Sequence, residues 1–351
     1  MSVITDNTKL GQGRSLRDEM IVFVAMTALL AIVPFTGLYP FFVMQGLCFA
    51  LFACAFNLLI GYGGLLSFGH AMFLGTAGYF TAHALKEWGV TPELGIVIGT
   101  AGAFALAVLT GLVAIRRQGI YFAMITLALS QLVFFIYLQT PFTHGEDGIQ
   151  GIPQGTLFGL FDLSKPTVLY YVILVGFLIG FLIVFRAINS PFGEVLKSIR
   201  ENEQRAISLG YKADQYKLLA YILSGTLSGF AGSLKVFVAQ NASLTDVHWT
   251  MSGEIVLMTL VGGLGTVFGP VVGAFVIVAM QQYLAGFGQW VTVIQGVIFV
   301  VCVLTFRRGI VGEIAAVYWL PTYRIAAVFG VIVVVLLLRP QGLFGTKAVA
   351  K

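Results

Sequence analysis

A dense group of ionisable side chains, able to form ion pairs and charged hydrogen bonds, lies within residues 190–217. Acids and bases are interleaved there, at Glu194, Lys197, Arg200, Glu201, Glu203, Arg205, Lys212, Asp214 and Lys217. Each charge would cost several kcal/mol in hydrocarbon, so this stretch must lie in water, although its surroundings are apolar. Its basic excess favours the cytoplasmic side of a membrane. These residue types suit a contact with a soluble protein partner.

The remaining candidates for chemistry form no catalytic or nucleotide-binding pattern. None of the four histidines shares a short motif with cysteines or carboxylates: His70, His83, His144 and His248. The phosphate-binding pattern GxxxxGK followed by Ser or Thr is absent. The cysteines stand in apolar runs without metal-ligand spacing, as small core residues do: Cys48, Cys54 and Cys302. We therefore expect no enzymatic activity, no metal and no cofactor in this chain.

Composition points to a polytopic membrane protein. Of the 351 residues, 58% are hydrophobic and only 10% are charged, whereas soluble domains carry about 25% charged residues. A spanning helix needs roughly 20 apolar residues. We expect an all-α bundle of about 9–11 transmembrane segments, some broken or half-length. The apolar runs are 20–38, 41–60, 65–85, 94–115, 120–138, 167–185, 218–238, 271–284, 291–306 and 324–338, with a half-length run at 253–261.

Charges at the ends of these runs set the expected orientation. If residues 1–19 form a cytoplasmic tail, alternate crossings place the basic segments inside, which are 116–117, 190–212 and 307–308. The acidic-leaning loop 140–166 then falls outside. This count requires both 253–261 and 271–284 to cross. A single crossing by 324–338 would leave the basic C-terminus outside, so we favour an extra partial crossing within 310–321 over a tail that breaks the charge rule. The basic residues lie at helix ends and not on one face, so no nucleic-acid partner is expected.

Residues 192–209 are predicted to form one amphipathic helix. Pro191 prevents the preceding span from continuing, and Gly210 supplies a stop. The apolar residues of one face are Val195, Ile199 and Ala206. We expect this helix to dock into a groove on a cytoplasmic partner. The alternative is a helix lying on lipid headgroups, but such a face would be more uniformly basic.

Glycine clusters and isolated polar residues interrupt the apolar runs. The clusters are Gly61, Gly63 and Gly64, and Gly262, Gly263 and Gly265. They are read either as sites of close helix packing or as broken helices along a transport path. The polar candidates for lining that path are Asn57, Ser67, His70, Thr126, Gln131, Glu254 and Gln281. For each, a hydrogen bond between helices is the competing interpretation, and Glu254 needs a partner or water at membrane depth.

Four segments, in order, resemble the branched-chain amino-acid ABC transporter permeases of the LivM type. They are GYGGLLSFGHAMFLGTAGYFTA at 61–82, the segment 119–153 with GIYFAMITLALSQLVFFI and HGEDGIQGIP, the stretch SPFGEVLKSIRENEQRAISLGYKADQYKLLAYILSGTLSGFAGSL from 190, and GGLGTVFGPVVGAF at 262–275. Within the third segment, Glu203, Ala206 and Gly210 look like a loose form of the EAA motif, whose short helix fits a cleft of an ATPase subunit.

The resemblance implies a permease subunit of an ATP-driven importer, with its transmembrane domain at 20–312 and its coupling loop at 190–212. Two cytoplasmic ATPases would bind Mg-ATP, a second homologous permease would complete the path, and an external binding protein would deliver substrate. The location would be the bacterial inner membrane. Branched-chain amino acids are the expected substrate, and urea or short-chain amides are the alternative. An ion-coupled secondary transporter is a more remote alternative hypothesis.

The chain departs from the family pattern at its end. That pattern usually ends near RRGIVG at 307–312, whereas this chain continues with a C-terminal extension, 313–351, that holds one further apolar helix. Its LLLRPQGLFG resembles the end of the partner permease type. The coupling reading also predicts that Gly210→Pro, or a reversed charge at Arg205, separates ATP hydrolysis from uptake while the protein stays inserted.

Overall fold

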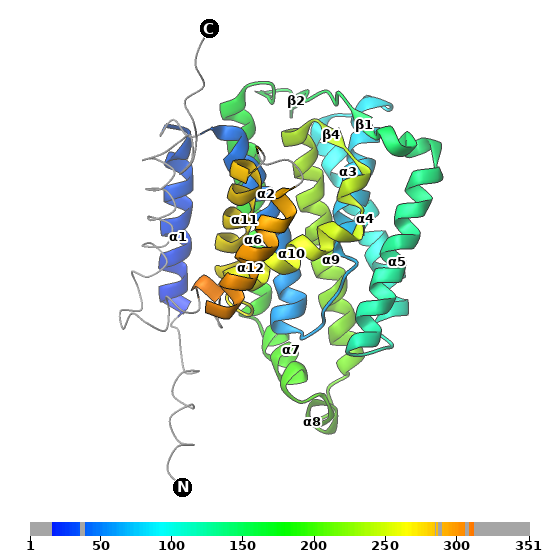
Figure 1. Ribbon diagram of the computed structural model, residues 1–351, viewed down its shortest axis with the longest axis vertical. Coiled ribbons are helices and arrows are strands. Elements are labelled where there is room, and N and C mark those ends of the chain that lie inside the picture. Colours follow the sequence, from blue (N-terminus) through cyan, green and yellow to red (C-terminus); the bar gives the residue numbers. More distant parts are fainter. Residues whose placement is uncertain (1–15, 36–38, 285, 287–289, 306–308, 312–351) are drawn as a thin grey trace.

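The computed structural model describes residues 16–35, 39–284, 286, 290–305 and 309–311 (Figure 1). The expectations for residues 1–15, for the basic pair 307–308 and for the extension 313–351 lie outside these residues. The helices are α1 (Leu16–Ile32), α2 (Pro40–Asn57), α3 (His70–Lys86), α4 (Pro92–Ala114), α5 (Ile120–Gln139), α6 (Pro166–Ile188), α7 (Pro191–Glu201), α8 (Glu203–Ser208), α9 (Ala213–Ala239), α10 (Trp249–Gly262), α11 (Gly269–Leu284) and α12 (Trp290–Thr305).

Short elements connect these helices. A π-helical turn, η2 (Leu58–Tyr62), continues α2. The 3₁₀ turns are η1 (Val33–Phe35), η3 (Pro141–Thr143), η4 (Gly145–Asp147) and η5 (Leu244–Asp246). Two-residue strands form two small antiparallel sheets, in which β1 (Ile149–Gln150) pairs with β4 (Asn241–Ala242) and β2 (Thr156–Leu157) with β3 (Phe161–Asp162).

The described part of the chain is a helical bundle with the apolar helices that a multi-pass membrane protein requires. Five helices are long and apolar enough to cross a bilayer: α2 with its π turn, α4, α5, α6 and α9. The apolar parts of α1, α10 and α11 are shorter. This confirms the expected all-α polytopic class.

Helices α2 and α9 form the centre of the bundle (Figure 1). Most of the α2 span is buried inside the protein, whereas only 28% of the α4 and α5 spans is buried. Small residues let α9 approach its neighbours. A Cβ at Gly229 would overlap the Cβ of Ala103 on α4, and one at Gly232 would overlap the backbone of Leu74 on α3. Close packing through small residues is how helices associate in a bilayer.

The loops and short elements that connect the helices lie at the two ends of the bundle. Figure 1 shows α7 and α8 at one end, hereafter the α7–α8 end, and the small strands at the other, the β end. At the β end, Lys86 Nζ donates to the carbonyl of Gln150, 2.9 Å away. Backbone and hydroxyl hydrogen bonds from Ser164 lower the pKa of the Asp162 carboxyl there. At the α7–α8 end, Gln118 Nε2 lies 2.8 Å from Glu203 Oε1.

Helices α10 and α11 are joined by one loop, and that each crosses the bilayer, as the count of crossings requires, stays a prediction. The loop that joins them contacts Asn57 at the α7–α8 end, where the Gly265 N–H donates to the Asn57 side chain. At its other end, α11 places the ring of Tyr283 6.4 Å from that of Phe42 on α2.

Several element boundaries differ from the expected ones. The run expected from 65 starts its helix only at His70, because Gly64 has a φ of 69° and the following residues are not helical. Conversely, α9 begins at Ala213, before its apolar run, since its first turns are polar but helical. The half-length run at 253–261 belongs to a helix that starts at Trp249.

Candidate functional site

The coupling loop folds as two helices, not as the single helix expected over 192–209. Asn202 separates α7 from α8, with extended backbone at φ −156° and ψ 97°. Its side-chain oxygen accepts a hydrogen bond from the Arg205 N–H at 3.0 Å, which is the usual role of an asparagine at a helix N-cap. We call residues 190–212, with both helices, the α7–α8 lobe.

An apolar inner face holds the lobe to the bundle. Ile199 and Ala206 are buried together with Ala213 of α9, and Val195 and Tyr216 pack against them. Leu196 is fully buried in the main core. The expected face of Val195, Ile199 and Ala206 is therefore the one that faces the protein.

Arg200 connects the lobe to the end of α2. Its Nη1 donates a hydrogen bond to the backbone carbonyl of Gly61, in the π turn. Its Cγ lies 2.8 Å from where a Cβ at Gly64 would sit. Gly64 has φ 69°, which L side chains rarely adopt. Glycine is needed there for both reasons.

Asn57 connects the end of α2 to the loop between α10 and α11. Its Nδ2 donates to the carbonyl of Thr266 at 2.9 Å, and its Oδ1 accepts from the Gly265 N–H at 3.0 Å. A Cβ at Gly61 would approach the Gly265 nitrogen to 2.8 Å. The two glycine clusters of the sequence therefore meet beneath Arg200, and we call this group of Asn57, Gly61, Arg200 and Gly265 the junction.

Glu203 faces the protein and fixes α8 to two other elements. One carboxylate oxygen lies 2.5 Å from Lys217 Nζ on α9, and the other accepts from Gln118 before α5. The Lys217 side chain is only 4% exposed. A lysine this buried is stable when charged only if it keeps a paired anion.

The outer surface of the lobe is partly apolar. Ile207, Leu209 and Tyr211 are 47%, 71% and 41% exposed, and α8 protrudes beyond the bundle (Figure 1). Gly210 lies between the last two with φ 93° and ends the helix. Arg205 is exposed, and Lys197 pairs with Glu194 at 2.7 Å on the exposed side of α7. Sequence reasoning missed this apolar tip, although its residues stand in a charged stretch.

Three of the polar path candidates lie close together and are buried. Thr126 on α5 accepts from the Phe68 N–H at 3.2 Å, and Ser67 accepts from the Gly69 N–H at 3.2 Å. His70 Nε2 lies 2.8 Å from the Ser224 hydroxyl on α9. All three therefore form hydrogen bonds within the protein. Gln131 is only half-buried on α5.

Glu254 lies apart from them, on α10. It accepts a hydrogen bond from Gln281 Nε2 at 2.9 Å, which joins α10 to α11. An ion pair between Lys235 of α9 and Asp246 of η5 lies near it. Sequence reasoning missed Lys235, because one lysine does not interrupt a long apolar run. The lysine within that run was the available signal.

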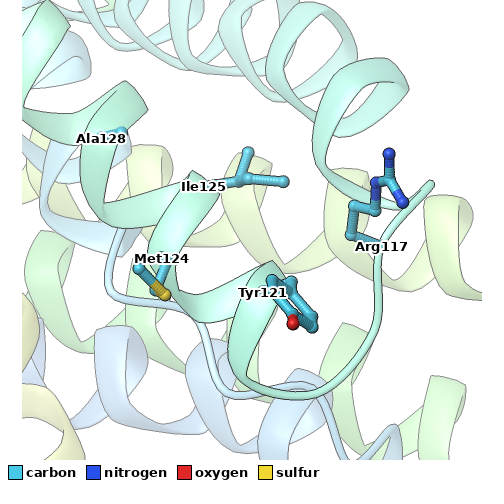
Figure 2. A pocket seen from close by; sticks show the side chains of 5 residues that line it. All are labelled: Arg117, Tyr121, Met124, Ile125 and Ala128. Carbon is cyan, nitrogen blue, oxygen red and sulfur yellow. The ribbon is translucent and has the colours of Figure 1, made fainter.

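An open hollow of about 760 Å³ lies along α5 at the α7–α8 end (Figure 2). It is lined by Arg117, Tyr121, Met124, Ile125 and Ala128. None of the polar path candidates lines it. Among the described residues, no group of three or more His, Cys, Asp or Glu side chains could hold a metal ion.

Comparisons with known proteins agree on one family. A family model described as "Branched-chain amino acid transport system / permease component" matches residues 39–304. The chain is 26% identical over 320 residues to the high-affinity branched-chain amino acid transport system permease protein LivM of Salmonella typhimurium, covering 80% of this chain and 74% of that protein. LivM of Escherichia coli is 25% identical with the same coverage. The ribose import permease protein RbsC of Bacillus subtilis is 24% identical over 302 residues, 78% of this chain and 92% of that protein. No solved structure matches.

Proposed function

The chain belongs to the family described as branched-chain amino acid transport system / permease component, and from this premise we propose that it is the permease subunit of an ATP-driven importer for branched-chain amino acids. The two LivM relatives support this substrate class. The ribose permease relative supports import by a shared scaffold with a different substrate. Urea or a short-chain amide is the alternative substrate. The transmembrane domain extends over 20–312, with 313–351 as an appended segment.

The apolar tip of the α7–α8 lobe is the observation that carries the proposal. Ile207, Leu209 and Tyr211 stand exposed on a charged lobe that projects from the bundle. Burying apolar surface contributes about 25 cal/mol per Å², so a soluble partner with an apolar cleft would cover the tip favourably. Lipid headgroups are a poorer match, because acids and bases alternate on this lobe. The proposed partner is a cytoplasmic ATPase subunit, one of two, and Mg-ATP binds in those subunits.

Sidedness follows from this partner. The α7–α8 end faces the cytoplasm, as does the N-terminus, and the β end faces the outside of a bacterial inner membrane. A second, homologous permease completes the translocation path. An external binding protein delivers substrate to the β end, where the loops 86–92, 140–165 and 240–248 gather.

The contacts of the lobe supply a mechanism for coupling. When two ATPase subunits close on ATP, they carry the lobes of the two permeases toward each other. Arg200 transmits this movement to the π turn of α2, and Asn57 carries it to the loop between α10 and α11. The Glu203–Lys217 pair transmits it to α9. ATP shifts the equilibrium between two states of the path only through contacts that differ between them, and these are the contacts in question.

Uptake by the assembled complex in vesicles tests the proposal. The chain is reconstituted with its partner permease, ATPases and binding protein, and radiolabelled leucine, urea and ribose are compared. Leucine uptake that requires both ATP and the binding protein is the expected result. If only urea or ribose is taken up, and uptake still requires ATP, the proposed mechanism is supported and the proposed substrate is wrong. Uptake without ATP, driven by an ion gradient, would overturn the mechanism.

A further inference from the structure

An ion pair lies inside the bundle near its β end. Lys235, close to the end of α9, pairs with Asp246 of η5, and their side chains are only 14% and 11% exposed. The Lys235 ammonium also lies 5.4 Å from the ring centroid of Phe49 on α2. The pair therefore joins α9 to η5, only 11 positions further along the chain, and brings both beside α2, which is distant in sequence.

A second carboxylate accompanies this pair. Glu254 of α10 interacts electrostatically with both Lys235 and Asp246, while Gln281 of α11 donates a hydrogen bond to it. The cluster thus combines one cation with two anions. Beside Glu254, a Cβ at Gly253 would meet no described atom within 4 Å, so open space adjoins this part of α10.

A buried ion pair is weak evidence for a purely stabilising role. A buried ion pair is often no more stabilising than well-packed apolar residues of similar volume, because desolvation of both charges offsets their attraction. An unused polar group also lies nearby. The hydroxyl of Tyr79 on α3 is buried, has no hydrogen-bond partner among the described residues, and interacts electrostatically with Asp246. Buried polar groups are usually hydrogen-bonded, so this hydroxyl is available to a ligand or a water molecule.

We infer that Lys235, Asp246 and Glu254 form a receiving site for the ammonium and carboxylate groups of a zwitterionic amino acid. The inference rests on the proposed function, which brings substrate to the β end. The substrate carboxylate replaces Asp246 beside Lys235, and the substrate ammonium binds the released Asp246 or Glu254. Tyr79 can donate its hydroxyl to the substrate carboxylate. When no substrate is bound, Asp246 takes the place of the substrate carboxylate beside Lys235.

This exchange explains how the permease would select its substrate class. A zwitterion restores a partner to each charge that it separates. Urea, short-chain amides and sugars carry no charge, so separating Lys235 from Asp246 for them leaves charged groups without partners. Specificity of this kind comes from the penalty on the wrong ligand as well as from contacts with the right one.

The test uses the assembled complex with its binding protein and measures leucine uptake per ATP hydrolysed. Replacing both partners together, Lys235→Met with Asp246→Leu, avoids leaving a lone buried charge. We expect the ratio to fall about tenfold, which corresponds to about 1.4 kcal/mol, because the substrate loses a charged partner for each of its two charged groups. Glu254→Gln, which can still bond to Gln281, is expected to lower it as well. The matched control removes one cation and one anion that interact electrostatically outside the cluster at the same end, Lys165→Met with Asp162→Leu, and should leave the ratio unchanged.

The outcomes separate the two claims. If wild-type complex shows ATP-dependent leucine uptake and the Lys235/Asp246 variant, recovered in equal amount, keeps the wild-type ratio, the pair is structural and the receiving site is wrong. If wild-type complex transports only urea or ribose, the proposed substrate is wrong and the receiving site falls with it. A lowered ratio in the double variant with a normal control supports the site.

Discussion

The guanidinium of Arg200 donates a hydrogen bond to the backbone carbonyl of Gly61. This contact joins the surface lobe to the point where α2 ends in a π turn. It also lies beside Gly265, so three elements meet at one side chain. A displacement of α7 must therefore move the end of the central helix, or break this bond.

Arg200→Ala should weaken coupling between ATP hydrolysis and uptake. The variant loses a hydrogen bond from a charged donor, which is worth roughly 1.5–3 kcal/mol. We expect uptake per ATP hydrolysed to fall at least about tenfold, measured in reconstituted vesicles. Arg186→Ala, at an exposed arginine of the same end on α6, is the control and should behave like wild type. An unchanged ratio in Arg200→Ala would show that the junction does not couple ATP hydrolysis to uptake.

The apolar tip should bind the ATPase subunit. Replacing Ile207 and Leu209 by Asp places charge where apolar surface becomes buried, and each lost side chain forfeits about 1.5–3 kcal/mol. We expect the ATPase to dissociate from the permease on affinity purification, while membrane insertion is kept. Leu209→Met preserves an apolar side chain and should retain the complex. Copurification of the Asp variant at wild-type yield would contradict the docking surface.

The Glu203–Lys217 pair should stabilise the attachment of α8. Glu203→Leu leaves Lys217 buried without its anion, and breaking a buried pair costs about 3–5 kcal/mol. We expect a lower Tm in detergent, and recovery of most of the loss in the double variant with Lys217→Met. The more exposed pair of Lys197 and Glu194, whose side chains are 35% and 69% exposed, gives the comparison, since Lys197→Met should change stability by no more than about 1 kcal/mol. Equal effects at the two pairs would show that burial of Lys217 is unimportant.

Packing of α9 against α4 should depend on Gly229. Alanine is favoured over glycine in a helix by roughly 0.5–1 kcal/mol, but a Cβ at Gly229 overlaps Ala103. Gly229→Ala should therefore destabilise the protein, by about 1–3 kcal/mol. Gly296→Ala on α12, where a Cβ meets no described atom within 4 Å, should be neutral or slightly stabilising. Thermal unfolding of both variants in detergent measures the difference, and stabilisation at Gly229 would refute the close approach.

Apolar run length predicted most of the bundle, because crossing a bilayer demands a long apolar segment whatever its neighbours. It failed where backbone conformation decides the boundary. Residues 65–69 are largely apolar but follow Gly64 at positive φ, so α3 starts at His70. The break at Asn202 was also missed, although an asparagine followed by Glu203 is a usual helix start.

The candidate site was predicted only in its parts. Asn57 and Gly265 were each singled out, but they are 208 positions apart and their hydrogen bond depends on how α2 packs against α11. Glu203 was expected in the coupling helix, whereas its partner Lys217 could be identified only from the packing of α8 on α9. Lys235 and Asp246 were hidden for a similar reason, since neither residue alone marks a site.

A photo-crosslinker at Leu209 tests the central claim most directly. Benzoylphenylalanine at this position, in membranes that hold the assembled complex, reports what covers the tip of the α7–α8 lobe. We expect a covalent product with the ATPase subunit. The same probe at Phe158 of the β end should give no product with that subunit. Crosslinks from position 209 to lipid alone, in a complex that is otherwise intact, would contradict it.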